Sequence, residues 1–247
     1  MIRFEAVCKS FGGRKILENF NLDIEQGQIF VILGRSGTGK SVALKHLVGL
    51  LKPDSGKIFL DGIALNPLSE REFMSVRRKC GIVFQLPALL DSRNLFENLT
   101  LGIRELPMTQ KIARVQKMLS EVQLDYLQPL LFKRTPHNLS YGEQKRVSLA
   151  RTLLSNPDYV LYDEPTTGLD PVTARVIHEL IRKVSRDLNK TSVLVSHDMR
   201  NALRIADRLA ILSEGRIVDQ GSPDEILRSK NVVTAEFLAG IHGGSHG

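Results

Sequence analysis

Residues 34–41 read Gly34-Arg35-Ser36-Gly37-Thr38-Gly39-Lys40-Ser41, and the rest of the chain can be interpreted outward from them. They follow the apolar run Ile29–Leu33 and precede a helix-forming segment that begins at Val42. Strand, glycine-rich turn and helix in this order, with the spacing G-x-x-x-x-G-K-S, are the context of a phosphate-binding loop. The glycines let backbone N–H groups curl around an anion, and the positive end of the helix dipole faces the same point. The alternative is an ordinary glycine turn between a buried strand and a helix.

Two side chains of this loop carry chemistry. Lys40 is expected to reach the terminal phosphates of a ligand as a point charge. The Ser41 hydroxyl is expected to ligate Mg²⁺. The loop therefore predicts a site for a phosphorylated ligand together with its metal ion.

The composition is that of an ordinary soluble globular protein. The 247 residues suffice for one large α/β domain or a core plus a lobe, with 42% apolar and 25% charged residues. The longest apolar runs fall far below the roughly 20 residues that a membrane span needs, and the first residues lack a signal-peptide core. Only two cysteines, Cys8 and Cys80, favour a reducing compartment, so a cytoplasmic location is expected.

The net charge of +7 permits attraction to nucleotides, nucleic acid or an anionic membrane face. The basic residues are scattered along the chain, however, and no long basic run singles out nucleic acid. No nucleic-acid partner is therefore expected.

A second apolar run, Tyr159–Asp163, ends in two adjacent carboxylates. Asp163 at the end of a core strand can orient Mg²⁺, and Glu164 beside it can polarise an attacking water as a general base. Two acids at a strand tip can also form a plain solvated turn. The phosphate-binding loop in the same chain favours catalysis.

Two more strands end in polar side chains. The strand 81–84 stops at Gln85, whose amide can contact a metal-bound water or simply satisfy loop backbone. The buried strand 192–196 ends at His197, where open α/β sheets bind ligands, so its imidazole can hydrogen-bond a γ-phosphate. The alternative is a capping or loop histidine, since Asp198 can itself cap the next helix. On position alone that alternative is preferred.

Turn and capping residues predict the remaining elements. Phe11 precedes a turn at Gly12-Gly13, and its ring can stack on an adenine or pack on the sheet, with equal weight. Strands are expected at 2–7, 22–24, 57–60, 209–212 and 216–219. Helices are expected to begin at Ser69, Asp170 and Ser222.

The middle of the chain, roughly residues 86–157, is helical in its periodicity. One helical face carries Ile112, Val115, Leu119 and Val122, so this region is expected to form a helical lobe inserted into the α/β core. Within it, Ser140-Tyr141-Gly142-Glu143 is a capping box that opens a helix. The same helix start, with a hydroxyl, a glycine and free N–H groups, is also a candidate second anion site.

The order of these motifs resembles the ATP-binding subunits of ABC transporters over nearly the whole chain. The resemblance implies an α/β fold: a P-loop NTPase core with a RecA-like, mostly parallel sheet, an antiparallel β subdomain and an inserted helical subdomain. It implies a single ATPase domain at 1–240, with a β subdomain and core at 1–85, the helical subdomain at 86–157 and the core continued at 158–240. Residues 241–247 are expected to form a disordered tail.

The resemblance also implies roles, with ATP and Mg²⁺ as the ligands. Phe11 would stack on the adenine. The implied phosphate-binding residues are Gly34, Arg35, Ser36, Gly37, Thr38, Gly39, Lys40, Ser41 and Val42. The implied metal-binding residues are Ser41, Gln85 and Asp163, and the implied catalytic residues are Glu164, His197 and Gln85.

Proteins of this kind act as head-to-tail dimers that clamp two ATP molecules, so a second copy of the chain is the first implied partner. Ser140 and Gly142 would then act on the partner's nucleotide. ATP closes the dimer because both subunits contact the γ-phosphate, and hydrolysis lets it reopen. The motion would pass to membrane-spanning permease subunits docked in a groove at Leu86–Leu101, with the chain peripheral on the cytoplasmic face of the inner membrane.

Two residues depart from the family's L-S-G-G-Q pattern. Tyr141 replaces the first glycine and Glu143 replaces the glutamine. The backbone N–H at 141 is unaffected, and the glycine at 142 is retained. Glu143 adds negative charge near a bound anion but favours the helix dipole, so part of its role is expected to be structural.

The segments Ala88–Leu99, Gly102–Glu105 and Glu236–Gly240 resemble ATPases of Mce-type phospholipid transporters, the class that maintains lipid asymmetry. A Mce-type substrate-binding protein is then a further expected partner. The alternative is the ATPase of an amino-acid or other small-solute importer.

A hypothesis from another class is a soluble ABC-type ATPase that acts on DNA or the ribosome. Such proteins carry long coiled coils, zinc modules or two fused ATPase halves. This chain has only short helices between Gln85 and Ser140 and one set of motifs, which disfavours that class.

Overall fold

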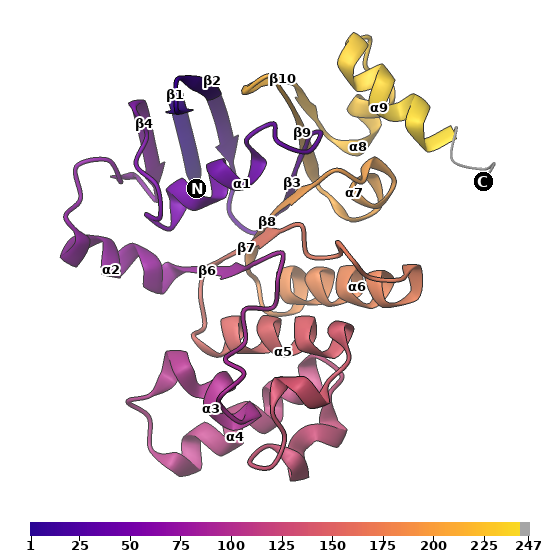
Figure 1. The fold of residues 1–247 in the computed structure, drawn as a ribbon. Helices are drawn as coiled ribbons and strands as arrows, with labels where there is room; N and C mark the ends of the chain where they lie inside the picture. The colour runs from indigo at the N-terminus through magenta and orange to yellow at the C-terminus, as the bar shows by residue number, and fades with distance from the viewer. Residues whose placement is uncertain (243–247) are drawn as a thin grey trace.

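The computed structural model describes residues 1–242, which form two β-sheets and their surrounding helices (Figure 1). The first sheet is antiparallel with the order β2-β1-β4-β5. The second has the order β10-β9-β3-β8-β7-β6 and is parallel except for the last pair, β10 with β9. The strands are β1 (Ile2–Phe11), β2 (Arg14–Ile24), β3 (Ile29–Leu33), β4 (Ser55–Leu60), β5 (Ile63–Ala64), β6 (Cys80–Val83), β7 (Tyr159–Asp163), β8 (Thr191–Ser196), β9 (Arg208–Ser213) and β10 (Arg216–Gly221). The predicted α/β fold, with a mostly parallel sheet and a separate antiparallel one, is confirmed.

The helices expected from capping residues begin at those residues. Ser69, Ser140 and Ser222 each form a capping box, and Asp170 accepts from two backbone N–H groups at the start of its helix. No helix within residues 1–242 combines the length and the hydrophobicity needed to cross a bilayer. The helices are α1 (Lys40–Leu47), α2 (Glu70–Lys79), α3 (Leu95–Leu99), η1 (Thr100–Ile103), α4 (Met108–Glu121), η2 (Asp125–Leu130), η3 (Pro136–Asn138), α5 (Tyr141–Leu154), α6 (Pro171–Asp187), α7 (Met199–Ile205), α8 (Pro223–Leu227) and α9 (Val232–His242).

Strand β3 separates two hydrophobic cores. Its side chains alternate, so Ile29, Val31 and Leu33 face one core while Phe30 and Ile32 face the other. The first core holds the sheet against α5, α6, α7 and the helical region, and the second holds it against α1 and the antiparallel sheet. The helical region and the antiparallel sheet therefore lie on opposite sides of the six-stranded sheet (Figure 1).

The helical region shares its core with the sheet. Val115 and Leu119 of α4 are fully buried, as the predicted helical face requires, and they belong to the same cluster as Val147 of α5 and Val160 of β7. Helix α5 therefore packs between α4 and the six-stranded sheet.

Several boundaries differ from the sequence-based expectation. Strand β1 extends to Phe11 and β2 already begins at Arg14, so both are longer than the expected strands 2–7 and 22–24. Strand β4 begins at Ser55, two residues before the expected start at Lys57. Gly56 has φ +87°, and a Cβ there would lie 2.4 Å from the Ala6 carbonyl oxygen, so only glycine lets β4 start this close to the bulged β1.

The C-terminal end of the chain also differs. The helix capped by Ser222 has only five residues, and a second helix, α9, follows it. Residues 241 and 242 of the expected tail continue α9, and residues 243–247 lie outside the described residues.

A polar network at Asp61 joins the two sheets. Asp61, in the turn between β4 and β5, accepts hydrogen bonds from the Lys79 ammonium (2.9 Å), the Gln26 amide (2.8 Å), the amino group of Met1 and the Tyr159 hydroxyl of β7. Burial raises the pKa of this carboxyl, but the hydrogen bonds from Tyr159 and Lys79 outweigh burial and hold the pKa well below its ordinary value. The network therefore stabilises the fold as long as Asp61 is ionised.

Asp61→Asn is expected to lower the free energy of unfolding by about 2 kcal/mol at pH 7, because it removes a charged acceptor from this network. A depressed native pKa gives stability that is present above the unfolded pKa and lost as pH falls through the native one, so the deficit should narrow below about pH 4. Urea unfolding at pH 7 and pH 3 measures both effects. Asp23→Asn, at an exposed carboxyl, is the control, and an equal loss in the two variants would contradict the network's role.

Candidate active site

The candidate residues gather at the carboxyl edge of the six-stranded sheet. The loop 34–41 follows β3, Asp163 and Glu164 end β7, and His197 follows β8. Parallel pairing aligns these ends, with Leu33 opposite Ser196 and Asp163 opposite Val195. The sequence motifs therefore meet where open parallel sheets bind ligands.

The loop 34–41 depends on glycine at two close approaches. Gly39 caps α1 with φ +103°, and a Cβ there would lie 2.8 Å from the Ile16 carbonyl oxygen. A Cβ on Gly34 would lie 2.6 Å from the Thr38 Oγ1 and 2.7 Å from the Leu212 carbonyl oxygen. The loop thus packs against β2 at Gly39 and against β9 at Gly34, and only glycine fits at these two positions.

Lys40 and Ser41 extend the loop toward the two acids. The Lys40 ammonium is 4% exposed, donates to the carbonyl oxygens of Gly34 and Arg35 (both 2.9 Å) and lies 3.3 Å from Glu164 Oε1. The Ser41 hydroxyl donates to Asp163 Oδ1 at 2.6 Å. The loop after β3 and the acids after β7 are therefore one connected polar cluster.

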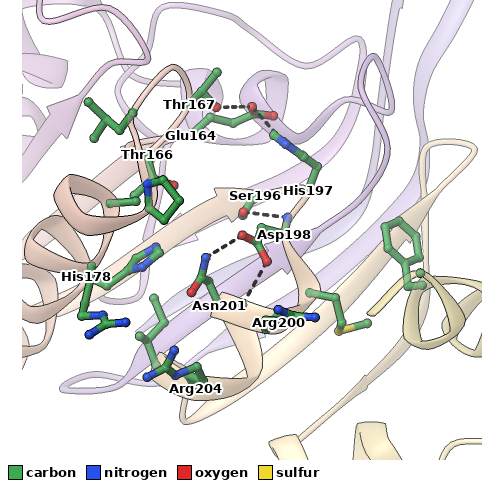
Figure 2. Close-up of a pocket in the computed structure, with 18 of the residues that line it drawn as sticks. Glu164, Thr166, Thr167, His178, Ser196, His197, Asp198, Arg200, Asn201 and Arg204 are labelled. Atoms are coloured by element: carbon green, nitrogen blue, oxygen red, sulfur yellow. Dashed lines mark hydrogen bonds and ion pairs between the residues drawn. The ribbon is translucent and has the colours of Figure 1, made fainter. Parts of the chain in front are cut away.

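Glu164 is the centre of a second set of contacts (Figure 2). It has φ +46°, and its Oε2 accepts from the Thr167 hydroxyl at 2.9 Å and lies 3.1 Å from His197 Nδ1. Burial raises the pKa of Glu164, but the Thr167 hydrogen bond and the charges of Lys40 and His197 outweigh burial, so the pKa lies below its ordinary value. Glu164 is therefore a carboxylate held in its ionised form at the site.

A cavity of about 960 Å³ opens beside Glu164 and His197. It runs along the turn 166–169 to α6, α7 and α9. Figure 2 shows Glu164, Thr167 and His197 together at one side of it, and Asp198 and Asn201 hydrogen-bonded to each other at the start of α7. Asp198 caps α7 while His197 contacts Glu164, so the capping role first preferred for this segment falls to Asp198.

The side chains of Phe11, Gln85 and Arg35 lie outside this cluster. The Phe11 ring is 46% exposed, with the Lys9 ammonium 5.4 Å from its centroid, so it is not a buried residue of the sheet. Gln85 is exposed. Its backbone carbonyl accepts from Lys145 and Tyr141, and its side-chain amide has no hydrogen bond within residues 1–242. The Arg35 guanidinium pairs with Glu236 of α9 at 3.0 Å.

The start of α5 is built as a cap. The Glu143 carboxylate accepts from the Ser140 N–H and hydroxyl, both at 2.7 Å, which accounts for the glutamate structurally. A Cβ on Gly142 would lie 2.5 Å from Thr173 Cγ2, so α5 packs closely against the start of α6 here. Among the hydrogen bonds of residues 1–242, none joins residues 140–142 to the loop 34–41.

Sequence reasoning missed Thr167 and Lys145. Thr167 orients Glu164, and Lys145 is a buried lysine of α5 whose ammonium donates to the Gln85 carbonyl. Neither residue stands out by motif or periodicity: Lys145 meets Gln85 from 60 residues away, and Thr167 lies three residues after Glu164 in a turn where a threonine is an ordinary residue.

The donor chemistry at Ser41 and Asp163 fits Mg²⁺. Hydroxyl and carboxylate oxygens are its preferred ligands, and these two lie at hydrogen-bond distance from each other. No group of three His, Cys, Asp or Glu side chains in the described part of the chain gathers as a metal cluster. The site therefore suits a cation that takes one or two protein oxygens and completes its shell with water and phosphate.

A family model described as "ABC transporter" matches residues 17–167. The chain is 38% identical over 242 residues to the glycine betaine/carnitine/choline transport ATP-binding protein OpuCA of Bacillus subtilis, covering 96% of this chain and 62% of that protein. It is 40% identical over 245 residues to the methionine import ATP-binding protein MetN of Haemophilus influenzae, covering 96% of this chain and 70% of that protein. This chain thus spans less than two thirds of OpuCA.

The intermembrane phospholipid transport system ATP-binding protein MlaF of Haemophilus influenzae is 37% identical over 232 residues, 93% of this chain and 86% of that protein. Among solved structures, the dimeric post-hydrolysis state of the ATP-binding cassette MJ0796 bound to ADP and Pi matches with a TM-score of 0.81. That structure shares 32% identity and covers 90% of this chain and 99% of its own.

Gly39→Ala is expected to destabilise the fold by about 3 kcal/mol, because it combines a left-handed φ with a Cβ pressed against the Ile16 carbonyl. Gly37→Ala is the matched variant: φ is +78° but nothing lies within 4 Å of the new Cβ, so a loss of about 1 kcal/mol is expected. Denaturant midpoints measure the difference. Equal losses would show that the close approach at Gly39 is not a constraint.

Proposed function

This chain belongs to the ABC transporter family of ATP-binding proteins, and on that premise we propose that it powers a phospholipid transporter. Members of the family bind and hydrolyse ATP, and the chain is an ATP-binding subunit with ATPase activity. The observation that supports the site assignment is the cluster of Lys40, Ser41, Asp163, Glu164 and His197 at one sheet edge.

Each residue of this cluster has a separate proposed role in ATP hydrolysis. Lys40 and the N–H groups of the loop bind the terminal phosphates, and a phosphate replaces the carbonyl partners that Lys40 now has. Glu164, ionised and oriented by Thr167, accepts a proton from the attacking water, and His197 hydrogen-bonds the γ-phosphate. Ser41 and Asp163 would hold Mg²⁺, and Gln85 is the third residue proposed to act on the metal. When bound, Mg²⁺ neutralises charge that develops on the phosphates.

A second copy of the chain completes each site in this proposal. Within residues 1–242, Ser140 and Gly142 make no hydrogen bond to the loop 34–41 of their own chain, and a nucleotide held by the partner is their proposed ligand. The dimeric form of MJ0796 with ADP and Pi supports this arrangement. ATP shared by both chains favours the closed dimer, and loss of the γ-phosphate removes that preference.

The permease is proposed to dock at residues 86–101. Leu86 is 69% exposed and Leu90 is 41% exposed, so the segment presents apolar side chains to solvent. Its main chain is held by Arg151 of α5, which donates to the carbonyl oxygens of Pro87 and Ala88. A partner on this surface would keep the chain peripheral, on the cytoplasmic side of a membrane.

Phospholipid is the proposed cargo because MlaF matches over most of its own length and the segments 88–99 and 236–240 resemble its class. The similar identity to MetN supports a second candidate, an importer of a small solute such as an amino acid. Isolation of the native complex from membranes, with mass spectrometry of its companion chains and bound molecules, distinguishes the two. Co-purified phospholipid with a Mce-type protein supports the first candidate, and a soluble solute-binding protein supports the second.

Glu164→Gln is expected to preserve ATP binding and to trap a closed dimer, with ATPase activity reduced by about 10²-fold or more, because the amide does not accept the water's proton. Size-exclusion chromatography with saturating ATP and Mg²⁺, and phosphate release from the assembled complex, are the measurements. Glu105→Gln, at an exposed residue of the helical region, should behave as wild type. A Glu164→Gln variant that stays monomeric, both alone and in its complex, is incompatible with the assigned role.

Lys40→Ala is expected to weaken ATP binding by about 100-fold, because the only ammonium inside the loop is lost. Retention on ATP resin or titration with a fluorescent ATP analogue measures this. Lys45→Ala on the same helix should bind normally. Undiminished retention of Lys40→Ala would count against the phosphate-binding loop itself.

A further inference from the structure

Lys145 is a buried cation that the mechanism above does not use. It lies on α5, is 2% exposed, and its ammonium donates to the carbonyl oxygen of Gln85. Burial lowers the pKa of Lys145 to about 8, against the opposing pull of the Asp163 and Glu164 charges. Burying an ammonium costs free energy even when it is paired, so packing alone is a poor reason for a lysine here.

Tyr141, one helical turn before Lys145 on α5, donates to the same Gln85 carbonyl. Its hydroxyl donates to the Gln85 oxygen at 3.2 Å, and its ring centroid lies 5.3 Å from the Lys145 ammonium. A Cβ on Gly168 would lie 3.4 Å from Tyr141 Cε1, so the ring also borders the turn that follows Glu164. The tyrosine that departs from the family's glycine thus makes contacts a glycine lacks.

These contacts hold the main chain of Gln85 and leave its side chain exposed to solvent. A carbonyl oxygen has two lone pairs, which Tyr141 and Lys145 fill together, while the Gln85 side chain stays exposed. Arg151, further along α5, holds the next carbonyls at Pro87 and Ala88. Residues 85–88 are therefore attached to α5 through their backbone.

We propose that Tyr141 and Lys145 form an α5 brace, a pair of positioning residues that holds the Gln85 main chain so that its amide reaches the nucleotide beside Asp163 and Glu164. This inference rests on the proposed role of Gln85 in the ATP site. Because α5 begins at Ser140, the brace also ties the loop of one site to the segment proposed to act at the other. The brace depends on the Tyr141 side chain, so a chain with glycine at this position, as in the L-S-G-G-Q pattern, lacks half of it.

The test uses the assembled transporter complex and measures ATP hydrolysis against Mg²⁺ and ATP concentration. Lys145→Met removes the donor at similar size, and Lys145→Gln keeps an N–H donor without the charge. We expect Lys145→Met to lower kcat about 10-fold, to raise the Mg²⁺ concentration for half-maximal rate, and to change the KM for ATP by less than about twofold. Lys145→Gln should recover part of kcat, and Lys117→Met, at an exposed residue of α4, should match wild type.

Thermal unfolding separates positioning from plain structural support. Replacing a buried charge by an apolar side chain of similar volume is often neutral or stabilising, so Lys145→Met should unfold at the same temperature as wild type or higher while turning over more slowly. A double-mutant cycle adds the second check. In a Gln85→Ala background, Lys145→Met and Tyr141→Phe should cause little further loss, because both act through Gln85.

Three results would overturn the brace. One is a Lys145→Met variant whose kcat and Mg²⁺ dependence stay within about twofold of wild type. Another is a loss of kcat from Lys145→Met that is as large in the Gln85→Ala background as in the wild type. The third is a lower unfolding temperature of Lys145→Met with no change in kcat. If Lys145→Met does not fold, the same criteria apply to Lys145→Gln and Tyr141→Phe. A wild-type complex without ATPase activity would overturn the proposed function and the brace with it, whereas an active one with unaffected variants overturns only the brace.

Discussion

The buried ammonium of Lys40 is the interaction on which the site depends. An ammonium has three donors, and here two carbonyl oxygens of the loop and the Glu164 carboxylate surround it. Glu164 in turn contacts Thr167 and His197, so one charge organises the ends of β3, β7 and β8. An arriving phosphate therefore exchanges partners with groups already in place, and does not have to order them.

The two cores explain how such a cluster is kept rigid. Alternate residues of β3 are buried on both faces, which fixes the position of its carboxyl end and of the loop that follows. Gly34 and Gly39 then bring the loop into contact with β9 and β2, so the antiparallel sheet supports the loop from outside the parallel one. The helical region is joined to the same framework by α5, which links its packing to Gln85 as well as to α4.

The sequence was sufficient for features set by local rules. Apolar runs that end in polar residues located the strand ends, and Ser69, Ser140 and Asp170 located helix starts, because caps and side-chain alternation act over a few residues. Contacts between distant segments were not predictable. The Gln85–Lys145 contact joins residues 60 positions apart and depends on how α5 packs. Tyr141 was treated as a missing glycine although its hydroxyl has a partner, the Gln85 carbonyl. The start of β4 at Ser55 was missed because Gly56 is shaped by the bulge at Ala6, on another strand.

The ion pair between Arg35 and Glu236 places α9 in direct contact with the phosphate-binding loop. Both side chains are largely exposed, so their attraction is weak and is screened by dissolved salt within about 10 Å at 0.1 M. The link between the C-terminal helix and the loop is thus strongest in dilute buffer. Raising the ionic strength weakens this ion pair, and with it the hold of α9 on the loop.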